Sequence, residues 1–155
     1  MADIILEGQD LTKYYPVQQG FLQKVVGHVR AVDGVSFKIE SGKTLSLVGE
    51  SGAGMTTTAK QVLLLEHPTS GKILFEGEDI TNWSMHRLKV NYRPRVQAVQ
   101  QNPWSSMNPR MRVRDIIAEP MQVNTKMTKQ QMRDRAMELL SQVGLEPRHM
   151  GHYPH

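Results

Sequence analysis

The sequence contains no cysteine, which excludes disulfide-stabilised scaffolds, cysteine-ligated zinc sites and cysteine nucleophiles. It also lacks an apolar run of the roughly 18 or more residues that a membrane-spanning helix requires. The N-terminal stretch MADIILEGQD carries Asp3 and Glu7 and no basic segment. We therefore do not expect a signal peptide here.

The composition is that of a globular protein. The chain has 155 residues, of which 39% are hydrophobic and 22% charged, and this length favours one domain with a single core. The net charge of +4 permits contact with anions such as nucleotides, nucleic acid or a lipid surface. It does not distinguish between them.

The first half of the chain is predicted to be rich in strands. Alternating or compact apolar residues predict strands at 29–39 and 44–48 and a strand that begins at 72–75, and residues 4–15 are predicted to be a short strand followed by a loop. Residues 16–28 are predicted to be an irregular insertion, because they hold two glycines and a proline. Asp33-Gly34 and Ser41-Gly42 are turn signals. A helix is expected over 56–65, broken by Pro68 to Gly71.

The second half is predicted to be mainly helical. We expect a short strand at 96–99, a loop at 102–109 and a helix at 111–119 that stops near Pro120. Thr128 and Gln131 form a capping box for a longer helix that Gly144 ends. One apolar stripe runs along that helix: Met132, Ala136, Leu139, Leu140 and Val143. Together the two halves predict an α/β fold.

A glycine-rich segment, LVGESGAGMTT at 47–57, lies between a predicted strand and a predicted helix. Its glycines at 49, 52 and 54 allow positive φ, so that successive N–H groups turn inward and the helix N-terminus adds its dipole. The hydroxyl of Thr56 is placed to ligate Mg²⁺. This spacing is that of a Walker A phosphate loop. The alternative is a glycine-rich turn that binds nothing.

Position 55 departs from the Walker A pattern. The pattern has lysine there, and this chain has Met55, which offers neither charge nor donor. Losing a charge-assisted hydrogen bond costs about 1.5–3 kcal/mol in the ground state. The loss should be larger in a phosphoryl-transfer transition state, where charge stabilisation dominates catalysis.

Several segments resemble one family. The stretches AVDGVSFKIESGKTLSLVGESGAG, PTSGKILFEGEDIT, QQNPWSSMNPRMRV and DIIAEPM are similar to those of the ATP-binding subunits of ABC transporters, in particular the oligopeptide/dipeptide importer branch. The resemblance runs from about Leu11 to His155. It implies an incomplete P-loop NTPase (RecA-like) core with an N-terminal antiparallel β subdomain and part of a helical subdomain.

The resemblance also implies a site for ATP and Mg²⁺. Tyr15 matches the aromatic residue that stacks on adenine, with a loop-packing role as the alternative. Gln101 matches the Q-loop glutamine, with an ordinary loop glutamine as the alternative. The positions that match the phosphate loop are Gly49, Ser51, Gly52, Ala53, Gly54, Met55, Thr56 and Thr57. The implied metal ligands are Thr56 and Gln101.

The sequence departs from the family at other points. Gln100 stands where the family usually has Phe, and Glu66-His67 replace a Gly-Leu pair. The family continues after Tyr-Pro-His with a signature motif, a Walker B carboxylate pair and a switch histidine, whereas this sequence ends at His155. We therefore expect a partial nucleotide-binding domain over 1–155. Residues 1–100 would hold the β subdomain and phosphate loop, and 101–155 the Q-loop and the start of the helical subdomain.

The resemblance implies integral-membrane permease subunits as partners, a second ATP-binding subunit in a homo- or heterodimer, and a location on the cytoplasmic face of the membrane. Trp104 and Met107 lie where the family approaches the permease, although a local core is the alternative. Nucleic acid is not expected as a partner, because the basic clusters at 87–95 and 110–114 carry few interleaved aromatics. The C-terminal histidines are not expected to hold a metal, since Pro147, Gly151 and Pro154 argue against a helix there.

The predicted function is therefore that of a nucleotide-binding component of an ABC-type peptide importer, unable to hydrolyse ATP as this chain alone. The alternative is a non-catalytic regulatory or interaction module of the same fold that binds a permease or an ATPase partner.

Overall fold

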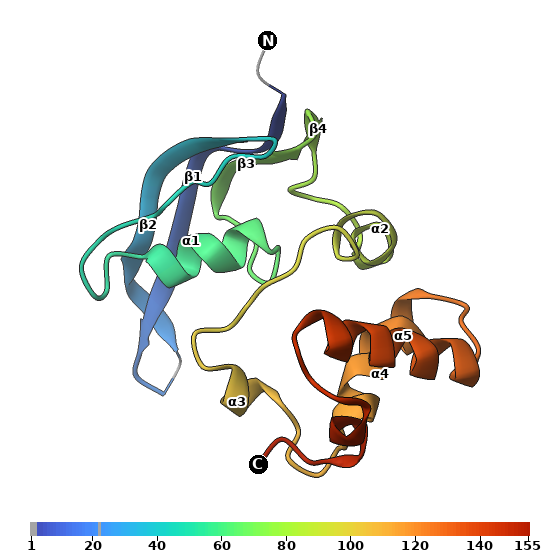
Figure 1. The fold of residues 1–155 in the computed structure, drawn as a ribbon. Coiled ribbons are helices and arrows are strands. Elements are labelled where there is room, and N and C mark those ends of the chain that lie inside the picture. The colour runs from blue at the N-terminus through green and yellow to red at the C-terminus, as the bar shows by residue number, and fades with distance from the viewer. Residues whose placement is uncertain (1–2, 22) are drawn as a thin grey trace. The chain divides into compact units, whose positions relative to one another are not determined.

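The computed structural model describes residues 3–21 and 23–155. The chain divides into two compact units, Met1–Val96 and Gln97–His155, which are described separately (Figure 1). No helix among the described residues is long and apolar enough to cross a membrane.

A four-stranded antiparallel sheet of order β2-β1-β3-β4 forms the frame of the first unit. Its strands are β1 (Ile4–Gln19), β2 (Lys24–Glu40), β3 (Ser70–Phe75) and β4 (Glu78–Asp79). β1 and β2 form a long two-stranded ribbon (Figure 1). The expected strands at 29–39 and 72–75 are thus confirmed, and both are longer than expected. The loop expected after a short strand within 4–15 is wrong, because β1 runs without a break from Ile4 to Gln19.

The prediction of an irregular insertion at 16–28 is wrong. The described part of that segment is the end of a β-hairpin, in which Pro16 pairs with His28 and Gln19 with Lys24. Gly20 and Gln23, both with positive φ, flank the tip; Leu22 lies outside the described residues. The proline and glycines are tolerated because this two-stranded ribbon is solvated and bulged rather than buried.

Asp33-Gly34 is not a hairpin turn as predicted. Gly34 has φ 73° inside β2, where the pairing jumps from Leu11–Val35 to Thr12–Asp33. This register shift is a β-bulge, and glycine with positive φ is common at such positions in a strand. The turn at Ser41-Gly42 is confirmed, with a hydrogen bond of 3.1 Å from the Lys43 N–H to the Glu40 carbonyl.

Helix α1 (Met55–Val62) lies against β1 and β2 (Figure 1). It ends before the predicted residue 65, because Leu64 has φ 49° and turns its side chain into the core. The core of this unit is apolar: Leu6, Leu11, Val32, Leu64, Ile73, Phe75, Ile80, Leu88 and Tyr92. Its other helical segments are α2 (Met85–Arg87) and the π-helix η1 (Leu88–Tyr92).

Tyr92 connects the core to α1. Its ring meets Phe75 edge to face at 5.0 Å, and its hydroxyl donates a 2.7 Å hydrogen bond to the Val62 carbonyl at the end of α1. Burial raises the pKa of Tyr92 to about 12. The bond therefore holds the C-terminal end of α1 at ordinary pH.

The predicted strands at 44–48 and 96–99 are wrong. Neither segment pairs with any strand in the described parts of the chain. Val48 and Val99 are 89% and 95% exposed. Compact apolar runs of this kind form strands where neighbouring strands hydrogen-bond to their edges and helices cover both faces of the sheet. Among the described residues, no strand pairs with either segment.

The second unit is helical. It consists of α3 (Pro103–Ser106), α4 (Val113–Asn124), α5 (Lys129–Gln142) and the 3₁₀ helix η2 (Pro147–Gly151). Its small core joins Ala136, Leu140 and Met150, with Val113 and Ile117 of α4 packed against them. The predicted loop at 102–109 thus contains the short helix α3.

The capping box of α5 is confirmed. Thr128 and Gln131 exchange hydrogen bonds of 2.8 and 3.3 Å, and Gly144, with φ 74°, follows the helix. The predicted stripe is buried only as far as Leu140, since Val143 is 70% exposed. Pro120 does not end α4 as predicted but lies inside it. The helix continues to Asn124, whose side-chain amide donates a hydrogen bond to the Pro120 carbonyl.

Candidate phosphate-binding site

The glycine-rich loop at 49–54 leads directly into α1. Gly52 and Gly54 have φ of 89° and 85°, as the sequence predicts. Gly49 does not have positive φ, so that part of the prediction is wrong. Glycine fits position 49 for a different reason: a Cβ at this residue would lie 3.2 Å from the Ala53 Cβ and 3.5 Å from the Met55 sulfur.

Gly54 is the N-cap of α1 and fixes the helix on the sheet. A Cβ at this residue would lie 2.0 Å from the carbonyl oxygen of Ala31 in β2, so no larger residue fits without moving the helix or the strand. Farther along α1, the side-chain amide of Gln61 donates a 3.0 Å hydrogen bond to the Thr12 carbonyl in β1. α1 is therefore held by both long strands, by β2 at its start and by β1 near its end.

The N-terminus of α1 presents backbone donors. The N–H groups of Met55, Thr56 and Thr57 belong to the first turn, where an α-helix supplies no intrahelical acceptor. Thr58 is the first to bond back, at 2.8 Å to the Gly54 carbonyl. Free N–H groups and the positive end of the helix dipole favour an anion of phosphate size at this place.

Met55 folds back over the loop. Its sulfur and Cγ face Gly49, and the residue is half-buried. The only charged residue within 49–57 is Glu50. Any attraction for phosphate must therefore come from the backbone and the helix dipole, because the loop itself contains no cation.

The three threonines that follow differ in their surroundings. The Thr58 hydroxyl donates to the Gly54 carbonyl at 3.1 Å, and the Thr57 hydroxyl interacts with the Tyr15 hydroxyl. The exposed Thr56 hydroxyl has no hydrogen-bond partner among the described residues. Of the three threonines, Thr56 is thus the one whose hydroxyl is available to ligate a magnesium ion. Magnesium is a hard cation that prefers oxygen ligands.

Tyr15 reaches the same helix from β1. Its hydroxyl donates a hydrogen bond to the Glu66 carboxylate, which also accepts one from Lys60 at 3.1 Å. This bond from Tyr15, followed by that from Lys60, lowers the pKa of the Glu66 carboxyl below its ordinary 4.5. The same contact raises the pKa of Tyr15. The Lys13 ammonium lies 5.4 Å from the centre of the Tyr15 ring.

Glu66 and Lys60 did not emerge as site residues from the sequence. The signal that could have found Glu66 is its departure from the family's Gly-Leu pair. Tyr15 and Thr57, which are 42 positions apart in the sequence, are brought together by the packing of α1 on β1.

Gln101 lies in the other unit, exposed and just before α3, whose N-cap is Asn102. Joint ligation of one Mg²⁺ by Thr56 and Gln101 therefore stays a prediction. Within the first unit, the first-turn N–H groups and the Thr56 hydroxyl fit a nucleotide phosphate and its metal. The loop lacks the cation that would hold them tightly.

Comparison with known proteins places this geometry in context. A family model described as ABC transporter matches residues 32–155. The chain is 44% identical over 153 residues to the oligopeptide transport ATP-binding protein AppF of Bacillus subtilis, covering 99% of this chain and 46% of that protein. It is 40% identical over 151 residues to the dipeptide transport ATP-binding protein DppF of Escherichia coli, covering 97% and 45%. The chain thus spans about half the length of the curated relatives it matches.

Solved structures share the fold. The dimeric ATP-binding cassette MJ0796 in a post-hydrolysis state, bound to ADP and Pi, superposes with a TM-score of 0.78 at 23% identity. The match covers 97% of this chain and 62% of that one. A further dimeric structure of MJ0796, described as a bacterial ABC transporter cassette, gives a TM-score of 0.79 at 22% identity. The expected fold, an incomplete P-loop NTPase cassette with an antiparallel sheet, is confirmed.

Proposed function

The chain belongs to the ABC transporter family, and from that membership we propose that it binds ATP with Mg²⁺ at residues 49–57 as the nucleotide-binding component of a peptide importer. The observation that carries the proposal is the N-terminus of α1. Gly54 is packed against the Ala31 carbonyl, and the donors of Met55, Thr56 and Thr57 follow it in the first turn.

The nucleotide would be held by groups of this chain in the following roles. The first-turn N–H groups and the loop around Gly52 would donate to phosphate oxygens, and Thr56 would ligate Mg²⁺. Tyr15 would stack on the adenine from β1, and Gln101 would supply the second metal ligand. The metal would supply neutralisation of the phosphate charge. Tyr15 supports this arrangement because its hydroxyl already lies beside Thr57.

We further propose that these 155 residues do not hydrolyse ATP. Met55 cannot place a cation on the phosphates, and transition-state charge is what phosphoryl-transfer enzymes must stabilise. The sequence also contains no Walker B carboxylate pair, signature motif or switch histidine matching the family. Binding without turnover is the expected behaviour.

Partners and location follow by analogy with the relatives. AppF and DppF are named as transport ATP-binding proteins for oligopeptides and dipeptides, and MJ0796 is dimeric. We propose that this chain works with integral-membrane permease subunits and a second ATP-binding subunit, as a homo- or heterodimer, on the cytoplasmic face of the membrane. Nucleic acid has no part in this proposal.

A second candidate function is a non-catalytic regulatory or interaction module of the same fold that binds a permease or an ATPase partner. The observation that favours it is the apolar side chain of Met55, which folds over Gly49. Met55 would then close the loop against phosphate, so that the fold is kept while nucleotide binding is lost.

Titration with a fluorescent ATP analogue separates the two functions. The nucleotide-binding function predicts saturable, Mg²⁺-dependent binding of the analogue. Unlabelled ATP should displace the analogue, and Thr56→Ala should weaken its binding. Thr69→Ala is a control of the same chemistry elsewhere in the unit, because the Thr69 hydroxyl accepts from the Tyr14 N–H, away from the loop. A chain that is folded by circular dichroism and shows no displaceable binding would favour the second function instead.

A further inference from the structure

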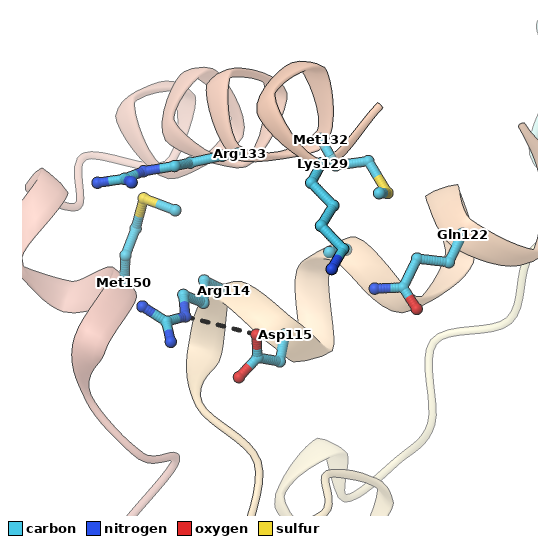
Figure 2. Close-up of a pocket in the computed structure, with 8 residues that line it drawn as sticks. Arg114, Asp115, Gln122, Lys129, Met132, Arg133 and Met150 are labelled. Atoms are coloured by element: carbon cyan, nitrogen blue, oxygen red, sulfur yellow. Dashed lines mark ion pairs between the residues drawn. The ribbon is translucent and has the colours of Figure 1, made fainter. Parts of the chain in front are cut away.

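A cleft of about 360 Å³ lies within the second unit, between α4, the start of α5 and η2. Arg114 and Asp115 come from α4, Lys129 and Arg133 from α5, and the thioether of Met150 from η2. In Figure 2 these side chains gather around one opening. The cleft lies far along the chain from the phosphate loop, and the proposed nucleotide site does not use it.

Its charge is unbalanced. Three cations line it and only one carboxylate, Asp115, which is 3.4 Å from the Arg114 guanidinium. Lys129 and Arg133 form no ion pair with any described residue. They stand four positions apart on α5, where like charges repel. Lys129 also occupies the first turn of the helix, the end that disfavours a cation.

The placement of Lys129 and Arg133 destabilises α5, and no ion pair within the described residues offsets this effect. By contrast, Arg135 on the same helix pairs with Glu138 at 2.8 Å. An anionic partner at the cleft would relieve the repulsion between Lys129 and Arg133 and complete their hydrogen bonding.

The cleft also has an apolar component. Met132 and Met150 line it and are each only 8% exposed. Methionine is flexible and polarisable, and it adapts to partner side chains of different shapes. An inorganic anion would make no use of these two side chains, whereas a peptide with an apolar residue among its carboxylates would.

The exposure of the charged side chains that line the cleft favours a protein segment over a small molecule as its ligand. Small-molecule sites usually enclose 70–90% of the ligand. Here Arg114, Lys129 and Arg133 are all exposed, and the buried side chains are methionines. A segment of another protein can lie across such an open cleft and still reach the charged side chains at its rim.

We propose that this cleft docks an acidic segment of a partner protein. The carboxylates of that segment would pair with Lys129 and Arg133, and an apolar side chain between them would contact Met132 and Met150. The inference concerns an interaction surface and is independent of nucleotide binding.

The test uses the full 155-residue chain and two labelled peptides of equal length. One is rich in Glu with interspersed Leu; the other has Lys in place of each Glu. Fluorescence anisotropy should show saturable binding of the acidic peptide only, weakening as salt rises. Arg133→Glu should reduce the affinity about tenfold or more, and Arg133→Gln should reduce it less. Arg135→Glu is the matched control, with the same charge change on the same helix, and should have an effect of less than about twofold.

Three results would overturn the proposal. Equal losses from Arg133→Glu and Arg135→Glu would mean non-specific attraction to a positive helix. Binding of inorganic phosphate or of vesicles containing anionic lipid that depends on Arg133, without binding of the acidic peptide, would assign the cleft to another occupant. Absence of acidic-peptide binding to a chain that circular dichroism shows to be folded would leave the cleft without the proposed partner.

Discussion

The Tyr15 hydroxyl donates a hydrogen bond to the Glu66 carboxylate and so ties β1 to the turn that follows α1. Lys60 donates to the other carboxylate oxygen at 3.1 Å. At the opposite end of α1, Gly54 is packed against the Ala31 carbonyl in β2. The helix whose first-turn donors are proposed to bind phosphate is therefore held to the ribbon at both ends, by a side-chain hydrogen bond at one and by close backbone packing at the other.

Replacing Glu66 by Gln should lower stability in a pH-dependent way. The folded state lowers the pKa of Glu66, first through Tyr15 and then through Lys60. A carboxyl with a lowered folded-state pKa stabilises the fold above its unfolded pKa, near 4.5, and loses that contribution as pH falls through the folded value. Urea unfolding should show Glu66→Gln less stable than the parent at pH 7, with the difference shrinking as the pH falls below the unfolded pKa and through the lowered folded pKa.

The control for this experiment is Glu138→Gln, which removes a carboxylate that pairs with Arg135 on the surface of α5 in the other unit. It should change the stability of the first unit at neither neutral nor acidic pH. A Glu66→Gln difference that stays the same between pH 7 and pH 3 would show that ionised Glu66 does not hold Tyr15.

Met55→Lys should tighten ATP binding about tenfold or more. A lysine at this position would add a charge-assisted hydrogen bond, worth about 1.5–3 kcal/mol, to a set of backbone donors that is already assembled. Isothermal titration calorimetry with ATP and Mg²⁺ measures the gain. Met55→Gln, of similar length but without charge, is the matched control and should gain far less. Equal affinity of the parent and Met55→Lys would mean that the loop does not form a cradle.

The sequence predicted local features of the chain better than the pairing and packing of its strands. The glycine spacing correctly indicated positive φ at Gly52 and Gly54, and the Thr128–Gln131 pair correctly indicated a helix start. Both features depend on residues a few positions apart. The Tyr15–Glu66 contact was not predicted, because it joins residues 51 positions apart through the packing of α1 on β1.

The wrong predictions have a common physical origin. Residues 44–48 have the composition of a buried strand, but pairing needs a partner that local sequence does not specify. Residues 16–28 have the composition of a loop and still extend the hairpin, because the two halves of the segment continue β1 and β2 and pair with each other. In the same way, Pro120 was expected to end α4. The helix passes through it, with Val113 and Ile117 packed against the core of Ala136 and Leu140.

ATP hydrolysis by the 155-residue chain should not exceed background. Met55 supplies no charge to the phosphates, and the sequence offers no carboxylate pair matching the family's catalytic residues. Phosphate release measured with Mg²⁺ and ATP should equal that of a buffer blank, for the parent and for Thr56→Ala alike. Turnover by the pure parent chain that Thr56→Ala abolishes would contradict this prediction and would assign the activity to this loop.

The 155-residue chain should be only marginally stable, because the described residues leave an apolar segment beside the phosphate loop about half or more exposed. Leu45, Leu47 and Val48 are 49%, 52% and 89% exposed. Burying a large apolar side chain is worth roughly 1.5–3 kcal/mol, and whole domains have only about 5–15 kcal/mol of stability. We expect thermal unfolding to be broad, aggregation to accompany it, and a partner that covers 44–48 to sharpen and raise the transition. A sharp two-state transition of a monomer above about 60 °C would contradict this.

A matched pair of isosteric substitutions tests the exposed segment directly. Val48→Thr places a hydroxyl in solvent, so it should leave the unfolding free energy unchanged and reduce aggregation. Val32→Thr makes the same chemical change at a core residue that is 4% exposed, where an unpaired buried hydroxyl costs about 1–3 kcal/mol. Denaturant unfolding and light scattering of both variants measure the two effects. If Val48→Thr destabilises the chain as much as Val32→Thr, then residue 48 is buried in solution and the 44–48 segment is already covered, by the chain itself or by a second copy.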